Sequence, residues 1–95
     1  MWADVYAARG GAPSNARVAV LGLGGAFLEL RKDYSPGSLL GLRFRLPPTF
    51  HEVICWAVVR DRLEGRGVGV EFSDLAKTDA RRIDAFVTAR VTSKQ

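Results

Sequence analysis

Three glycines inside a long apolar stretch constrain the fold of this chain more than any other feature. Residues 18–30 run Val-Ala-Val-Leu-Gly-Leu-Gly-Gly-Ala-Phe-Leu-Glu-Leu, so two strand-like runs meet at Gly22, Gly24 and Gly25. Glycine tolerates positive φ and lets a neighbouring backbone approach closely, so such a cluster is typical of a sharp corner or bulge between strands. We therefore expect strands on both sides of it, at residues 16–21 and 26–31.

Length and composition bound the rest of the molecule. Ninety-five residues predict one domain, residues 1–95, and 47% hydrophobic with 25% charged residues is typical of a folded globular chain. The formal net charge of +4 fits an anionic partner, but solubility alone explains it equally well. The single cysteine excludes an internal disulfide, and no apolar run is long enough to span a bilayer. We expect a cytoplasmic protein without membrane insertion.

Alternation of apolar and polar residues predicts four further strands, at residues 2–9, 39–46, 52–61 and 67–73. The strand at 39–46 is the clearest, because Arg43 and Arg45 share one face and large apolar residues occupy the opposite face. The apolar face consists of Leu40, Leu42, Phe44 and Leu46. Pro47 and Pro48 end this strand, since proline cannot donate to a ladder.

The strand at 52–61 is apolar on both faces. We assign one face, with Ile54, Trp56 and Val58, to the core. The second face consists of Val53, Cys55, Ala57 and Val59. Because a strand with two apolar faces is covered on both sides, this second face needs a cover. The sequence leaves two covers open, the chain's own helix or a partner, and it permits a homodimer without requiring one.

One amphipathic helix is predicted at about residues 78–91. Thr78 suits the N-cap, and Asp79 suits the first turn, where the helix dipole stabilises a carboxylate. Apolar residues then recur at helical spacing, at Ala80, Ile83, Phe86 and Val87. Six short antiparallel strands over about residues 2–73, followed by one C-terminal helix, predict a mainly β protein built as a small barrel.

The ordered motifs of the chain resemble those of PilZ domains. The resemblance includes residues 21–28, Pro36-Gly37 before the leucine-rich strand, Leu46-Pro47, Val58-Val59-Arg60, and Gly-Val-Gly-Val-Glu-Phe at residues 67–72. These motifs occur in the family's order and spacing over nearly the whole chain. The resemblance implies a six-stranded β-barrel of a family whose members are not enzymes and are in many cases bacterial receptors for cyclic di-GMP.

Most residues with which this family binds cyclic di-GMP are replaced. The resemblance implies an Arg-x-x-x-Arg segment before the first strand, and an Asp/Asn-x-Ser-x-x-Gly motif on the second strand and its corner. Because the first strand begins at Trp2, we expect no room for the arginine segment. The second motif falls on Val20, Gly22 and Gly25, and only Gly25 matches it. We therefore expect no bound cofactor, with cyclic di-GMP binding lost.

Candidates for metal binding or catalysis are few. His51 and Cys55 share a strand face but lie ~13 Å apart at about 3.3 Å per residue, too far to ligate one metal ion. The sequence contains no nucleophile elbow, zinc-ligand spacing or phosphate-binding loop followed by a helix. We expect neither a metal site nor catalytic residues.

Two surfaces are candidates for interaction. The first consists of Arg43, Arg45, Arg60 and Arg62, for which the alternative is a solvated face with ion pairs to Asp61 and Glu64. The second is the apolar face of Val53, Cys55, Ala57 and Val59. We expect Tyr34, in a turn, at the surface, and Trp56 in the core. An apolar face with an arginine rim has the composition of a protein interface.

We interpret the chain as a non-enzymatic, PilZ-like adaptor that acts through a protein partner in bacterial signalling, in the control of motility, pili or surface behaviour. One alternative is a cyclic di-GMP receptor with an altered or partner-completed site. The second is a small basic barrel that binds nucleic acid. Aromatic residues on mostly inward-facing positions disfavour the second, because base-stacking platforms are exposed.

Overall fold

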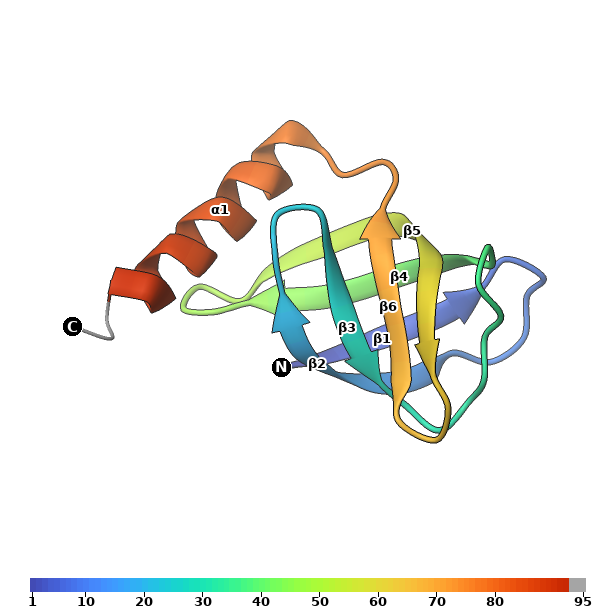
Figure 1. Ribbon diagram of the computed structural model, residues 1–95. Helices are drawn as coiled ribbons and strands as arrows, with labels where there is room; N and C mark the ends of the chain where they lie inside the picture. Colours follow the sequence, from blue (N-terminus) through green and yellow to red (C-terminus); the bar gives the residue numbers. More distant parts are fainter. Residues whose placement is uncertain (93–95) are drawn as a thin grey trace.

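Six antiparallel strands close into a barrel, and one helix lies beside an end of it (Figure 1). The computed structural model describes residues 1–92, with side chains through residue 89. The elements are β1 (Trp2–Ala7), β2 (Ser14–Leu21), β3 (Gly25–Glu29), β4 (Leu39–Leu46), β5 (His51–Leu63), β6 (Gly67–Phe72) and α1 (Lys77–Thr92). The predicted mainly β barrel with a C-terminal helix is confirmed.

The strands follow one another around the barrel in the order β1, β2, β3, β6, β5, β4, with β4 returning to β1. Two pairings between strands distant in sequence therefore close it. In the first, Ala3 of β1 lies opposite Phe44 of β4. In the second, β3 runs against β6, with Gly25 opposite Glu71 and Glu29 opposite Gly67. Closure leaves no strand edge unpaired along these registers.

The barrel interior is filled by apolar side chains, and no polar or charged residue among the described residues is buried. The predicted apolar face of β4 lies inside in full, while Arg43 and Arg45 lie outside. The buried residues are Ala3, Val5, Ala16, Leu28, Tyr34, Leu40, Leu42, Phe44, Leu46, Val53, Cys55, Ala57, Val59, Val68, Val70 and Ile83. Burial of apolar surface is thus the main stabilising term for this fold.

The two faces of β5 are the reverse of the prediction. Val53, Cys55, Ala57 and Val59 point into the barrel, so they are not the outward interaction surface that the sequence suggested. Their placement follows from the register with β4, in which Cys55 lies opposite the buried Leu42. Ile54 and Trp56, which we had assigned to the core, are exposed. Alternation cannot tell which of two apolar faces is inside, because cross-strand pairing decides it.

Three smaller predictions are also corrected. Tyr34 is buried, with Lys32 Nζ placed 5.6 Å from its ring centroid, rather than lying free at the surface. The helix begins at Lys77, so Thr78 lies inside the first turn and is not the N-cap. The Ala76 carbonyl instead accepts the first helical bond, from Ala80. The first strand ends at Ala7 instead of residue 9, because the chain turns there.

The glycine corner is confirmed as a tight hairpin between β2 and β3, in which the Gly22 N–H donates to the Gly25 carbonyl at 2.9 Å. A register shift between Val18 and Val20 precedes it. Such a bulge inserts one residue and reverses which face the following side chains occupy. As a result Val20 points outward and is strongly exposed, although it stands two residues after the inward-leaning Val18.

Gly25 and Gly67 lie at opposite ends of the β3–β6 pair, where the two backbones approach most closely. A Cβ on Gly25 would overlap the Val70 carbonyl oxygen, and a Cβ on Gly67 would overlap the Leu28 carbonyl oxygen. The neighbours in both cases are backbone atoms, which cannot move aside without separating the strands. This pairing therefore requires glycine at both positions.

Helix α1 packs on the barrel through its middle turns. Ile83 is fully buried against the core, and Phe86 and Val87 pack partly against it. Ahead of the helix, the Asp74 carboxylate accepts a hydrogen bond from the Trp56 backbone N–H at 2.7 Å. This bond fixes the linker to β5 and directs α1 toward the β4–β5 loop (Figure 1). No helix in the described part of the chain is both long and apolar enough to cross a membrane.

We predict that Gly25→Ala lowers the free energy of unfolding by at least about 2 kcal/mol, because the added methyl group overlaps backbone of β6. Gly24→Ala is the matched control, since a Cβ there has no neighbour within 4 Å. Urea unfolding of both variants measures the difference. Equal stability of the two variants would contradict the close approach of β3 and β6.

Candidate functional site

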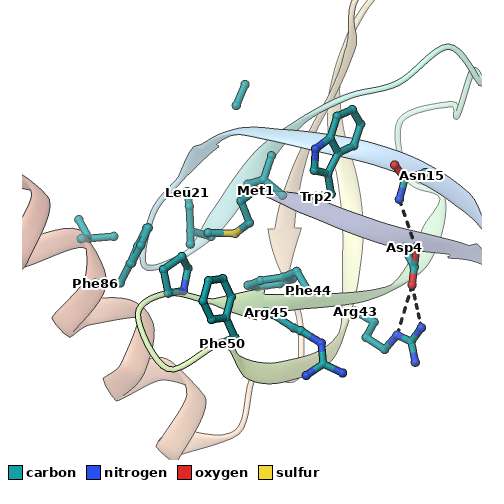
Figure 2. A pocket seen from close by; sticks show the side chains of 14 residues that line it. Met1, Trp2, Asp4, Asn15, Leu21, Arg43, Phe44, Arg45, Phe50 and Phe86 are labelled. Carbon is teal, nitrogen blue, oxygen red and sulfur yellow. Dashed lines mark hydrogen bonds and ion pairs between the residues drawn. The ribbon is translucent and has the colours of Figure 1, made fainter.

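A groove of about 710 Å³ lies between β1, β2, the β4–β5 loop and α1. Figure 2 shows Phe86 of α1 at one end of it and the polar group of Asp4, Asn15 and Arg43 at the other. Apolar side chains line the part between them. The complete lining is Met1, Trp2, Asp4, Asn15, Val18, Ala19, Leu21, Arg43, Phe44, Arg45, Pro47, Phe50, Phe86 and Val87.

The groove lies where the second half of β2 is only partly buried against the core. Along β2 only Ala16 is buried. Around the bulge, Val18, Ala19 and Leu21 of this strand line the groove beneath α1. The helix leaves the barrel at an angle rather than covering this space (Figure 1). A partly apolar depression therefore remains open between the barrel end and the helix.

Two aromatic side chains on the lining of the groove are largely exposed to solvent. Trp2 of β1 is 60% exposed and Phe50 of the β4–β5 loop is 59% exposed. Phe50 also has a φ of 58°, in the left-handed region that non-glycine residues rarely adopt. That conformation costs roughly 1–2 kcal/mol for a residue with a Cβ. A strained residue that exposes a large apolar group is typical of a recognition site rather than of packing.

The polar end of the groove is an ion pair with an amide beside it. Arg43 donates to Asp4 Oδ2 through Nη2 at 2.8 Å, and Asn15 donates to Asp4 Oδ1 at 3.4 Å (Figure 2). The Arg43 hydrogen bond lowers the pKa of the Asp4 carboxyl from its usual value. Arg45 is less engaged, because Glu52 Oε2 lies 3.7 Å from its Nη2. Arg45 is thus the cation of the groove with the most capacity left for a ligand.

A second hollow of about 520 Å³ adjoins the groove on the other side of Phe86. Pro47 and Phe86 line both spaces. His51 lies at the edge of the second hollow. Its Nε2 is 3.2 Å from Asp79 Oδ1 and 2.7 Å from Arg82 Nη1. His51 therefore connects the start of β5 to the first turns of α1.

The four arginines predicted as one interaction surface lie in two separate places. Arg43 and Arg45 are near one end of β5, whereas Arg60 and Arg62 are about 26 Å away at about 3.3 Å per residue. Arg60 Nε bonds Glu71 Oε1 at 2.7 Å, and Arg62 lies 3.9 Å from Asp33. The expected partners Asp61 and Glu64 are wrong, because Arg60 pairs with a carboxylate of the neighbouring strand β6 and Arg62 lies near one in the β3–β4 loop.

The three positions on which the family's second motif falls lie at the β2–β3 hairpin. Val20 is exposed on the outer surface, Gly22 lies in the turn, and Gly25 begins β3. From residue 18 to residue 28 the chain has no polar side chain. Only backbone groups are thus available to a ligand here, and the overlap described above accounts for Gly25 by packing alone.

The remaining candidates give no chemical site. No group of three or more potential metal-ligating side chains occurs among residues whose side chains the structure describes. Cys55 lies in the core, where burial raises the pKa of its thiol to about 11, with the Asp74 and Asp79 carboxylates adding to the effect. The thiolate is the reactive form, so this cysteine is inert in the folded state.

We predict that Cys55 reacts with a thiol-specific disulfide reagent at pH 8 only after unfolding, because a pKa of about 11 leaves very little thiolate at that pH. Absorbance of the released chromophore measures the reaction in buffer and in denaturant. Rapid, stoichiometric labelling of the folded chain would show that the β5 face carrying Cys55 is accessible.

Phe50 is the site residue that sequence reasoning missed. It follows Pro47-Pro48-Thr49, outside both the strand and the helix periodicity, so no pattern assigned it to a face. A large apolar residue that belongs to no periodic pattern, next to two prolines, is the signal that would have found it.

Comparison with known proteins agrees with this barrel. The model of the PilZ domain family matches residues 2–89, which is nearly the whole chain. The chain therefore belongs to the PilZ domain family, whose general context is cyclic di-GMP signalling and whose members are in general binding or adaptor domains rather than enzymes. Neither the search of curated proteins nor that of solved structures found a match.

Proposed function

We propose that this chain is a non-enzymatic PilZ adaptor that has lost cyclic di-GMP binding and acts through contacts with a protein partner. The observation that supports it is the run of residues 18–28, which has no polar side chain where the family's second motif holds the ligand. A carboxylate or amide is replaced by the isopropyl group of Val20, and a hydroxyl is absent at Gly22. The proposal depends on these positions alone and not on what precedes Met1.

The expected loss of affinity is large. Hydrogen bonds to charged groups contribute about 1.5–3 kcal/mol each, so two missing contacts remove about 3–6 kcal/mol, or two to four orders of magnitude in Kd. Substitute cations are scarce near the hairpin, since Arg17 is already bonded to Glu29 Oε1 at 2.7 Å. A partner-completed site would have to bring every one of these contacts from outside the chain.

Two surface features support a protein partner over nucleic acid. Exposed Trp2 and Phe50 border a groove with an apolar floor, and aromatic residues are enriched at protein interfaces. The exposed arginines that would neutralise phosphates are instead mostly paired with carboxylates, as at Arg43 with Asp4 and Arg60 with Glu71. We propose further that the adaptor acts in the cytoplasm, in the control of motility, pili or surface behaviour; the family's general context of cyclic di-GMP signalling supports this proposal.

Isothermal titration of the purified chain with cyclic di-GMP tests the loss of binding. We predict no saturable heat up to high micromolar ligand, while a PilZ domain with the complete motif gives a normal isotherm in the same buffer. Saturable heat with one or two sites would overturn the proposal. A two-hybrid survey of signalling and motility proteins tests the adaptor role, and failure to find any specific partner would count against it.

A further inference from the structure

The groove and the adjoining hollow form one depression across the end of the barrel, because Pro47 and Phe86 line both. We call this combined surface the α1 groove. It has a floor that includes Leu21, Phe44 and Phe86, and Phe50 lies at its border (Figure 2). The family's nucleotide-binding motif does not include these residues.

We propose that the α1 groove binds a short, acidic, amphipathic segment of a partner protein. In this arrangement apolar side chains of the segment enter the space between Trp2 and Phe50, and a carboxylate meets Arg45. The inference rests on the proposed adaptor function and names the surface and the chemistry of its partner.

The shape and the apolar content favour a polypeptide segment. The two spaces, of about 710 and 520 Å³, are each large enough for several side chains and are open rather than enclosed. Trp2 and Phe50 expose most of their surface in the free chain. Partly buried aromatic anchors that become fully buried on binding contribute most of the affinity at protein interfaces. The left-handed backbone at Phe50 holds that side chain outward at a cost to folding.

The charges around the groove favour an acidic partner. Its two spaces are lined by three arginines, Arg43, Arg45 and Arg82, and by one carboxylate, Asp4. Asp4 is already bonded to Arg43 at 2.8 Å. Arg45 lies 3.7 Å from its nearest carboxylate, beyond hydrogen-bond distance, whereas the exposed pairs of Arg17 with Glu29 and of Arg60 with Glu71 are 2.7 Å apart. Arg45 can therefore form a charge-assisted hydrogen bond with an incoming carboxylate.

The same features disfavour other occupants. A nucleic acid would need several free cations along one track, but Arg43 is paired and only Arg45 is loosely held on the first space. A second copy of this chain carries a formal net charge of +4, so the groove of one copy and the surface of another repel on average. An acidic segment has the complementary charge.

A random dodecapeptide phage library, panned against the full chain, tests the proposal. We expect enriched peptides that combine aromatic or aliphatic residues with Asp or Glu. The most enriched peptide is then synthesised with a fluorophore, and its Kd is measured by fluorescence polarisation. Phe50→Ser should weaken binding by about tenfold or more, as for an interface anchor, and Arg45→Gln by a smaller factor.

Matched variants distinguish the loss of a groove contact from the general effect of removing an exposed side chain. Ile54 is 64% exposed, close to the 59% of Phe50, but it lies on the outer face of β5. Ile54→Ser should therefore leave the Kd of the peptide unchanged. Arg60→Gln is the charge control for Arg45→Gln, because both side chains are similarly exposed. Phe50→Gly removes the anchor and at the same time relieves the left-handed backbone, so it should melt no earlier than the parent chain and still lose binding.

Several outcomes would overturn the inference. These are the enrichment of no peptide, the enrichment of basic peptides, and binding that Phe50→Ser leaves intact. Binding lost in Ile54→Ser instead would place the partner on the outer face of β5, which overturns the groove but leaves the adaptor function standing. Sedimentation showing a dimer that Phe50→Ser dissociates would assign the groove to a second copy. Cyclic di-GMP binding by calorimetry would overturn the adaptor function itself.

Discussion

The close approach of β3 and β6 is the constraint on which the rest of this molecule depends. Gly25 and Gly67 lie where a Cβ would overlap the opposite backbone, and only glycine lets the two strands pair along their length. That pairing joins the first three strands to the last three and closes the barrel. In the closed barrel, apolar residues of all six strands point inward and form a core without a buried charge among the described residues.

Closure also determines where a ligand or partner can bind. On the outer wall, ion pairs such as Arg17 with Glu29 and Arg60 with Glu71 join neighbouring strands. The interior is full. The end of the barrel beneath α1 is different, because the bulge in β2 and the angle of the helix leave a groove there that is lined largely by apolar side chains. Recognition is therefore expected at that end.

The sequence predicted those parts of the structure that local pattern specifies. The glycine corner, the inward face of β4 and the C-terminal helix follow from periodicity and turn chemistry, and the family resemblance placed them in one barrel. What failed depends on contacts between strands. The register with β4 determines which face of β5 lies inside, and the ion-pair partners of Arg60 and Arg62 come from other segments. Phe50 was not predicted as a site residue because it belongs to no periodic run of the sequence.

The central claim is that this PilZ barrel retains the family's scaffold while the surface of its β2–β3 hairpin no longer binds the dinucleotide. Amide-resolved NMR of the isotopically labelled chain, titrated with cyclic di-GMP to millimolar concentration, tests it most directly. The account predicts that the amides of Val20, Gly22 and Gly25 keep their positions throughout the titration. Saturable shifts at these three amides would contradict it, because they would show a nucleotide site built from backbone groups and cations outside the family motif.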